Sequence, residues 1–284
     1  MAMPLALILS SYVAASRIGG GAQQYALAPF GIDPVLIPTV MLGANPAKGG
    51  RGAATDPELF RNLIDGVESQ DLLGLVDVVI TGHFSLPEQV AMACEVIAKV
   101  RAAGRNGAFA PKPIVVTDPV LGDAPKGLYV KPAVAEALAR DLVPLADWIT
   151  PNLWELSFLA GREVADAPSV VEAVRALGRP ALVTSVPVSE NEIALACCAP
   201  LAAELFIHPR LAQAPNGTGD LVTAIFAAGL VRGEAPATAA ERAARAVAEA
   251  LAAAQAWNAP ELPLVALGDR LVRPSAPVRI ERLV

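Results

Sequence analysis

Short apolar runs alternate with longer amphipathic or alanine-rich segments along most of the chain. The short runs, which we predict to be strands, are residues 5–9, 34–39, 76–81, 114–117, 148–150 and 181–185. The longer segments, which we predict to be helices, are residues 19–28, a helix that starts at Asp56-Pro57, and residues 86–103, 131–142, 153–160, 221–230 and 235–257. Strands that are apolar on both faces are typical of a parallel sheet covered by helices on both sides. The pattern therefore predicts an α/β fold, a three-layer α/β/α arrangement with a mostly parallel central sheet.

Two later apolar runs break this alternation. Residues 193–198 and 203–208 are joined by a short link that contains Pro200. This spacing predicts an antiparallel hairpin at the edge of the sheet. No linker rich in Gly, Pro or Ser divides the chain, so we expect a single domain over residues 1–284.

Residues 43–54 have no apolar periodicity. They are rich in Gly, Ala, Asn and Lys and carry Lys48 and Arg51. Such a composition predicts a loop. The loop is either a flap that closes over a site or a tolerated surface insertion, and the sequence favours neither.

The most informative stretch is Pro215-Asn216-Gly217-Thr218-Gly219-Asp220, followed by an apolar run at 221–230. The run is apolar nearly all round, which is typical of a buried helix. Glycines at a helix N-terminus let another molecule approach the free N–H groups, which together with the helix dipole favour an anion, most often a phosphate. The stretch matches neither the P-loop pattern nor the dinucleotide-binding pattern, whose third glycine is replaced here by Val222.

Asp220 is unexpected in an anion site, because its carboxylate repels the anion. The repulsion is reasonable if Asp220 accepts the proton of a hydroxyl that attacks a phosphoryl group. Asp is also common as a helix N-cap. Both interpretations fit the local spacing.

Composition and charge exclude several classes of function. A net charge of −6 argues against a nucleic-acid partner. No run of about 18 apolar residues is present, so we expect no membrane-spanning helix. Two histidines, His83 and His208, rule out a multi-histidine metal site. The three cysteines have no metal-binding spacing and are expected to be reduced thiols, which suits the cytoplasm: Cys94, Cys197 and Cys198.

Polar side chains follow several of the predicted strands. In a parallel sheet the carboxyl ends of the strands share one edge, where ligands bind. Carboxylates for Mg²⁺, donors for phosphate oxygens and a base for the acceptor together suit phosphoryl transfer from ATP. The residues expected at this edge are Ser10, Ser11, Thr39, His83, Asp118, Asn152, Glu155, Thr184 and Ser185.

Three of these residues also have simpler interpretations. Asp118 precedes a proline and is typical of a turn. Glu155 is typical of an acid in the first turn of a helix. His83 is typical of a hydrogen-bonded histidine at a strand end.

Three motifs resemble those of the ribokinase-like superfamily. Gly217-Thr218-Gly219-Asp220 resembles its C-terminal signature. The segments Thr117-Asp118-Pro119-Val120-Leu121-Gly122 and Thr150-Pro151-Asn152-Leu153-Trp154-Glu155-Leu156 resemble two motifs of its vitamin-kinase branch. Within that branch the chain is most similar to the pyridoxal kinases, whose start, Thr39-Val40 pair and C-terminal ending it shares. The similarity covers essentially the whole chain.

The resemblance implies ATP-dependent phosphorylation of the 5′-hydroxymethyl group of a B6 vitamer by a homodimer. It implies ATP and Mg²⁺ as cofactors and leaves a monovalent cation open. The implied roles are a base (Asp220), an anion hole (Gly217, Thr218, Gly219), ATP binding (Asn152, Thr184, Ser185), acceptor binding (Ser11, Thr39, His83) and contact with Mg²⁺ and its waters (Asp118, Glu155).

The departures from the family lie on the acceptor side. Residues 41–52 contain no aromatic side chain, whereas the family has His, Tyr and Trp there. Phosphorylation of hydroxymethylpyrimidine or of another small molecule is therefore a close alternative. A non-catalytic protein that binds a vitamer or a nucleotide is an alternative of another class. A Rossmann oxidoreductase fits less well, because the glycine pattern and its position both differ.

Overall fold

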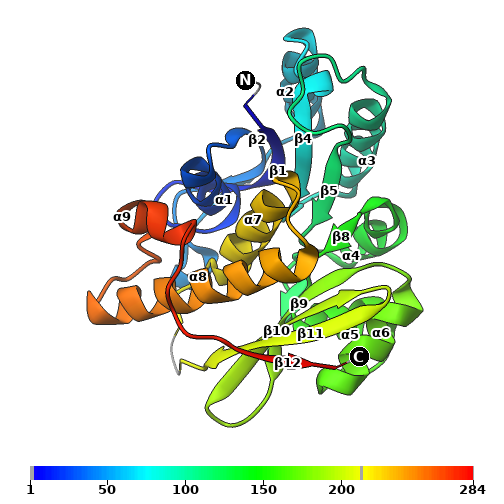
Figure 1. Ribbon diagram of the computed structural model, residues 1–284. Coiled ribbons are helices and arrows are strands. Elements are labelled where there is room, and N and C mark those ends of the chain that lie inside the picture. The colour runs from blue at the N-terminus through cyan, green and yellow to red at the C-terminus, as the bar shows by residue number, and fades with distance from the viewer. Residues whose placement is uncertain (1–2, 212–213, 284) are drawn as a thin grey trace.

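A computed structural model describes residues 3–211 and 214–283 of the chain (Figure 1). Its main sheet contains strands β1 (Leu5–Val13), β2 (Asp33–Leu42), β3 (Gly52–Ala54), β4 (Val76–Thr81), β5 (Ile114–Thr117), β8 (Trp148–Ile149), β9 (Ala181–Pro187), β10 (Glu192–Ala199), β11 (Ala202–Pro209) and β12 (Arg279–Arg282). A second small sheet pairs β6 (Gly122–Asp123) with β7 (Gly127–Leu128).

The strand order in the main sheet is β12-β11-β10-β9-β8-β5-β4-β1-β2-β3. The six strands from β2 to β9 in this order pair in parallel. Strand β3 is antiparallel to β2, and β10, β11 and β12 continue the sheet in antiparallel fashion at the other end. The predicted mostly parallel sheet with an antiparallel hairpin is confirmed.

Helices cover both faces of this sheet (Figure 1). One face is packed by α1 (Gly19–Leu27), α7 (Thr218–Val231), α8 (Pro236–Ala256) and α9 (Leu264–Leu267). The other is packed by α2 (Pro57–Ser69), α3 (Pro87–Ala102), α4 (Pro132–Ala137), α5 (Leu153–Ala160) and α6 (Ala167–Leu177). The three layers of the predicted α/β/α fold are therefore present.

The parallel strands are mostly apolar because successive side chains enter opposite cores. In β1, Ala6 and Ile8 pack toward α1 and α7, whereas Leu7 and Leu9 pack toward the helices of the other face. A strand that is buried on both faces does not alternate between apolar and polar residues. Its sequence is therefore a short, nearly continuous apolar run.

Three elements differ from the prediction. The β10–β11 hairpin is not at the edge of the sheet, because β12 pairs with β11 outside it. Helix α6 follows α5 and is not among the predicted helices. Residues 131–142 form α4 and then a π-helical turn, Leu138–Leu142, instead of one regular helix.

The loop predicted at residues 43–54 has local structure. It contains a 3₁₀ turn, Pro46–Lys48, which Asn45 caps through a hydrogen bond from the Ala47 amide, and it ends in β3. The backbone N–H of Gly43 donates to the carbonyl oxygen of Arg51 at 2.9 Å. The segment is thus a hairpin that extends from the end of β2.

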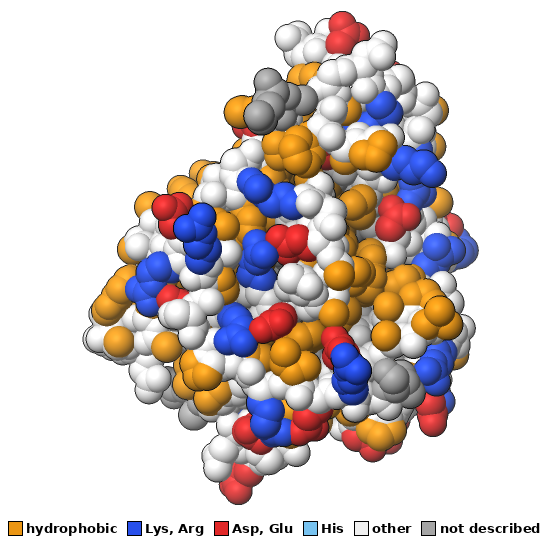
Figure 2. Space-filling model, viewed as in Figure 1, with side chains coloured by type: hydrophobic (Ala, Val, Ile, Leu, Met, Phe, Trp, Pro, Cys, Tyr) orange, Lys and Arg blue, Asp and Glu red, His pale blue; other side chains and the backbone are white. Residues whose placement is uncertain are grey.

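Basic and acidic side chains are interspersed among apolar ones on the face seen in Figure 2. That face therefore has no large patch of one sign. In the part of the chain that the structure describes, no helix is long and apolar enough to cross a membrane.

Candidate active site

Asp220 lies in the first turn of α7, where its Oδ2 accepts a hydrogen bond from the backbone N–H of Gly19 at 2.8 Å. Gly19 is the first residue of α1. The N-cap of α7 is Gly217, and no side chain caps this helix. Asp220 therefore does not cap its own helix. Its carboxylate is held by the start of another helix, 201 residues away in sequence.

Burial raises the pKa of the Asp220 carboxyl to about 6, against the opposing effect of the Gly19 hydrogen bond. At pH 7 such a group is mostly ionised, yet it is more basic than an exposed aspartate. A carboxylate with these properties suits general-base catalysis.

Ser11 lies against Gly19. A Cβ atom at Gly19 would be 2.1 Å from Ser11 Oγ and 2.7 Å from the Ser11 carbonyl oxygen, and the φ of Gly19 is +62°. Only glycine tolerates both the approach and the backbone conformation. The structure thus brings Ser11 and Asp220 together, with Gly19 between them.

The glycine-rich turn before α7 is also closely packed. Gly217 has a φ of +94°, and a Cβ atom there would be 2.3 Å from the carbonyl oxygen of Arg17. Thr218 and Gly219 follow in the first turn of α7, where backbone N–H groups have no partner within the helix. Together with the helix dipole these groups can stabilise an anion.

Asp118 lies just after β5 and is buried. Its Oδ2 accepts a hydrogen bond from Thr223 Oγ1 at 3.3 Å, and Thr223 Oγ1 lies 2.7 Å from Thr150 Oγ1. Burial raises the pKa of Asp118 well above its usual range, and the carboxylates of Glu155 and Asp220 raise it further. Asp118 therefore lies close enough to both Glu155 and Asp220 to be repelled by their carboxylates.

Glu155 caps α5 together with Asn152. One carboxylate oxygen accepts from the Asn152 backbone N–H at 2.8 Å, and the other accepts from the N–H groups of Leu121 at 2.9 Å and Gly122 at 3.4 Å. Burial raises the pKa of Glu155 to about 7, although these hydrogen bonds oppose the shift. Glu155 is thus an acid in the first turn of α5, as its simpler interpretation predicts.

Asn152 connects two of the predicted motifs. Its Oδ1 accepts from the Glu155 backbone N–H at 2.9 Å, and its Nδ2 donates to the Gly122 carbonyl oxygen at 2.8 Å. Asn152 also forms an isolated parallel bridge with Thr184. The ends of β5, β8 and β9 are in this way joined at one rim.

The carboxylates of Asp118 and Glu155 could hold a hydrated divalent cation. Among residues 3–211 and 214–283, no three His, Cys, Asp or Glu side chains are grouped so that they could ligate a metal directly. Mg²⁺ usually keeps several of its waters. A cation beside Asp118 would relieve the repulsion that raises the pKa of this carboxyl.

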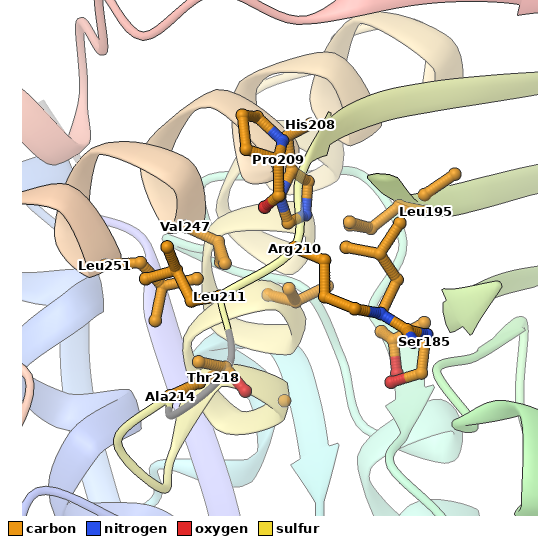
Figure 3. A pocket seen from close by; sticks show the side chains of 15 residues that line it. Ser185, Leu195, His208, Pro209, Arg210, Leu211, Ala214, Thr218, Val247 and Leu251 are labelled. Atoms are coloured by element: carbon orange, nitrogen blue, oxygen red, sulfur yellow. The ribbon is translucent and has the colours of Figure 1, made fainter. Parts of the chain in front are cut away.

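A hollow that is partly open to solvent adjoins the glycine-rich turn. Thr218 and Gly219 line it together with Thr184 and Ser185. Its walls are mainly apolar, and Arg210 extends toward Ser185 (Figure 3). A mainly apolar hollow that ends at an anion-binding turn is a candidate site for a nucleotide.

Thr39 lies near the end of β2 and His83 just after β4, the two strands that flank β1, which carries Ser11. Thr39 is fully buried, and its Oγ1 donates to the His83 carbonyl oxygen at 2.5 Å. Burial lowers the pKa of His83 to about 4, and its Nε2 lies 3.1 Å from Ser85 Oγ. The imidazole ring of His83 is therefore neutral at pH 7. This also fits the simpler interpretation of His83 as a hydrogen-bonded histidine at a strand end.

The chain matches known proteins over most of its length. A model of the phosphomethylpyrimidine kinase family matches residues 90–264. Over 285 aligned residues the chain is 31% identical to pyridoxal kinase PdxY of Leifsonia xyli subsp. xyli, covering 98% of this chain and 99% of that one. The chain belongs to the pyridoxal kinase family.

Two further relatives agree with this assignment. A pyridoxine/pyridoxal/pyridoxamine kinase of Bordetella avium is 31% identical, covering 89% of this chain and 86% of that one. The structure of pyridoxal kinase from Leishmania donovani in complex with ADP and pyridoxine has a TM-score of 0.89 and 26% identity, covering 99% of both chains. The ribokinase-like fold of the pyridoxal kinase family is therefore confirmed for this chain.

Two residues of the site were not predicted from the sequence. Gly19 holds Asp220 through its backbone N–H, and Thr223 links Asp118 to Thr150. The glycine cluster at residues 19–21 is a signal that could have identified Gly19, because glycine is favoured where φ is positive. Thr223 carries no such signal in the midst of an apolar helix.

Proposed function

We propose that this chain transfers the γ-phosphoryl group of ATP to the 5′-hydroxymethyl group of pyridoxal or a related B6 vitamer. Asp220 accepts the proton of the hydroxyl as it attacks the phosphorus in line. The amides of Gly217, Thr218 and Gly219 stabilise the negative charge on the transferring group.

One observation carries the proposal. A carboxylate with a raised pKa lies in the first turn of a helix whose free N–H groups can bind an anion, and the mainly apolar hollow reaches the same turn. A pure anion binder gains nothing from a carboxylate in this position. A phosphotransferase needs a base there.

ATP would occupy the hollow, with its phosphates toward Thr218 and Gly219 and its nucleoside near Thr184 and Ser185. Mg²⁺, when bound, would neutralise charge on the phosphates, and Asp118 and Glu155 would hold it through its waters. Asn152 would lie near the phosphates. A requirement for a monovalent cation stays open.

The acceptor would lie beside Ser11 and Asp220, with Ser11 and Thr39 as hydrogen-bonding partners. The neutral ring of His83 would pack against it. The hairpin at residues 43–54 would close as a flap and exclude water, which limits hydrolysis of ATP. We also propose that the chain acts as a homodimer and, given its free cysteines, in the cytoplasm.

The test is ADP release with Mg²⁺ and ATP in the presence of pyridoxal, pyridoxine, pyridoxamine or hydroxymethylpyrimidine. We expect turnover with a B6 vitamer. Asp220→Asn should keep ATP affinity and the fold but lose about 10²–10⁴-fold in kcat, which is the usual contribution of general-base catalysis. Unchanged turnover in this variant would end the assignment of Asp220 as the base.

Hydroxymethylpyrimidine is the second candidate acceptor. The absence of aromatic side chains from residues 41–52 and the match to the phosphomethylpyrimidine kinase family model both favour it. Turnover with the pyrimidine alone would keep the mechanism and change the substrate. Comparable binding of ATP and a vitamer without turnover on any acceptor would instead indicate a non-catalytic binding protein.

A further inference from the structure

Glu261 lies between α8 and α9 and binds three groups from two distant segments. Its Oε2 accepts from Ser16 Oγ at 2.7 Å and from the Arg17 backbone N–H at 3.3 Å. Its Oε1 forms an ion pair with Lys48 Nζ at 2.9 Å. Burial alone would raise the pKa of Glu261, but the contacts with Lys48, Ser16 and Arg17 hold the pKa below its usual value.

The Ser16–Arg17 segment leads directly to the proposed catalytic groups. The Arg17 carbonyl oxygen lies against Gly217, where a Cβ atom would be only 2.3 Å away. Two residues later, the Gly19 backbone N–H donates to Asp220 at 2.8 Å. One end of this short segment is therefore bound to Glu261, and the other end is bound to the base.

Lys48 connects the same carboxylate to the hairpin at residues 43–54. It ends the 3₁₀ turn of the hairpin, and its side chain is 55% exposed. Exposed ion pairs contribute little to stability and exchange readily with water. This contact can therefore break when the hairpin lifts and form again when it returns.

We propose that Glu261 is a positioning residue that couples the closed position of the 43–54 hairpin to the placement of Gly217 and Asp220. With Lys48 in place, the Glu261 carboxylate is neutralised and fixed against Ser16 and Arg17. The Arg17 carbonyl then stays against Gly217, and the Gly19 amide stays on Asp220. Phosphoryl transfer is favoured only when the hairpin is closed, an inference that rests on the proposed kinase function.

The test compares Glu261→Gln, Glu261→Ala, Lys48→Met and the Lys48→Met/Glu261→Gln double variant. Lys99→Met is the matched control, because Lys99 forms an exposed ion pair with Glu68 on the helices of the other face. We expect Glu261→Ala to lower vitamer-dependent kcat at least tenfold, with less change in the KM for ATP. Lys48→Met should lower it several-fold and raise ATP hydrolysis without acceptor, and the double variant should be no slower than Glu261→Gln alone.

Amide hydrogen exchange provides a readout that does not depend on turnover. We expect faster exchange at Arg17 and Gly19 in Glu261→Gln and Lys48→Met, and no change in Lys99→Met. Unchanged exchange at both amides would overturn the coupling even in a protein without kinase activity. If the wild-type protein phosphorylates a vitamer, and Glu261→Ala and Lys48→Met both leave kcat within twofold of it, the coupling is wrong and the proposed function stands.

Discussion

Asp220 has its raised pKa because it is buried, and the hydrogen bond from the Gly19 backbone N–H only partly offsets this effect. Below a pH of about 6 it is protonated in the folded protein and cannot accept a proton. We therefore predict that kcat/KM for the acceptor, at saturating ATP, falls about tenfold per pH unit below pH 6 and is level above pH 7.

This profile can be measured from pH 5 to pH 8 with two acceptors. The inflection should stay at the same pH when the acceptor is changed, because it belongs to the enzyme. Asp220→Asn should have no inflection in this range. A level profile in wild type would show that the ionisation of Asp220 does not limit the reaction.

Gly19 is the second critical position at the scale of single residues. Gly19→Ala would place a Cβ atom 2.7 Å from the Ser11 carbonyl oxygen, which cannot rotate away, at a φ of +62°. We predict a loss of stability of about 1–3 kcal/mol and a loss of turnover of more than tenfold, because the N–H that holds Asp220 shifts.

Gly21→Ala is the matched control for this change. Gly21 lies in the same helix, and a Cβ atom there meets nothing within 4 Å. Alanine in a helix is favoured over glycine by about 0.5–1 kcal/mol. Equal losses in the two variants, measured by urea unfolding and by ADP release, would contradict the specific role of Gly19.

At the scale of elements, the start of α2 was predicted correctly. Asp56 accepts a hydrogen bond from the Leu59 backbone N–H at 3.0 Å, and Pro57 occupies the first helical position. These local signals suffice because a cap involves residues only three positions apart.

We predict that Asp56→Ala lowers the free energy of unfolding by about 1 kcal/mol, with turnover per folded molecule unchanged. Asp56→Asn should retain most of the stability, because its side-chain oxygen can accept the same hydrogen bond. The measurement is urea unfolding of both variants. An equal loss in the two would show that the cap does not stabilise α2.

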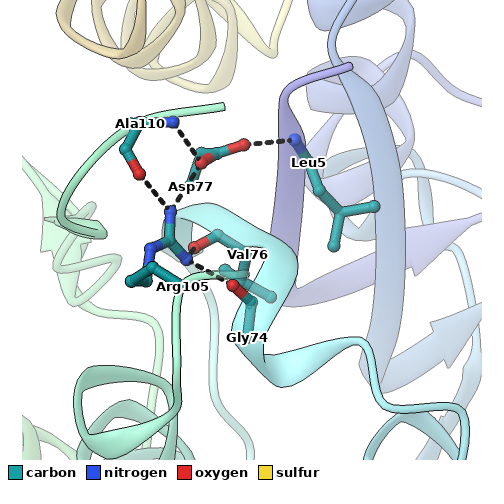
Figure 4. Close-up of polar contacts among 6 residues, drawn as sticks. All are labelled: Leu5, Gly74, Val76, Asp77, Arg105 and Ala110. Atoms are coloured by element: carbon teal, nitrogen blue, oxygen red, sulfur yellow. Dashed lines mark hydrogen bonds and ion pairs between the residues drawn. The ribbon is translucent and has the colours of Figure 1, made fainter. Parts of the chain in front are cut away.

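At the scale of the whole molecule, a buried ion pair joins segments at the rim opposite the site (Figure 4). Asp77, at the start of β4, is fully buried and accepts from Arg105 Nη2 at 2.6 Å, the Leu5 amide at 3.0 Å and the Ala110 amide at 2.8 Å. Arg105 also donates to the carbonyl oxygens of Gly74 and Val76. The cluster thus ties β1, β4 and the loop after α3 together.

We predict that Asp77→Ala lowers the free energy of unfolding by about 3–5 kcal/mol, because Arg105 and two amides lose their partner in the interior. The KM values of the folded fraction should not change, since the cluster lies at the amino ends of the strands. Arg61→Ala, which breaks an exposed pair with Glu95, should cost at most about 1 kcal/mol. Thermal and urea unfolding of the two variants distinguish these outcomes.

The amino-acid sequence was sufficient for the alternation of strands and helices, the parallel sheet and the rim where Asp118 follows β5 and Asn152, after β8, pairs with Thr184 of β9. These features depend on periodicity and turn chemistry within a few consecutive residues. Helix α6 was missed although its ends carry sequence signals, Asp166 as the N-cap and Gly178 as the C-cap. Strand β12 could not be predicted, because its four residues are all exposed and only Ile280 is apolar.

Only the tertiary structure decided how the site is held together. The Gly19 amide reaches Asp220 across 201 positions, and Glu261 reaches Ser16 across 245. Such contacts depend on how α1, α7 and the segment after α8 pack on one face of the sheet. No local pattern encodes that packing, because each partner is an ordinary glycine, serine or glutamate until the fold brings it to the other.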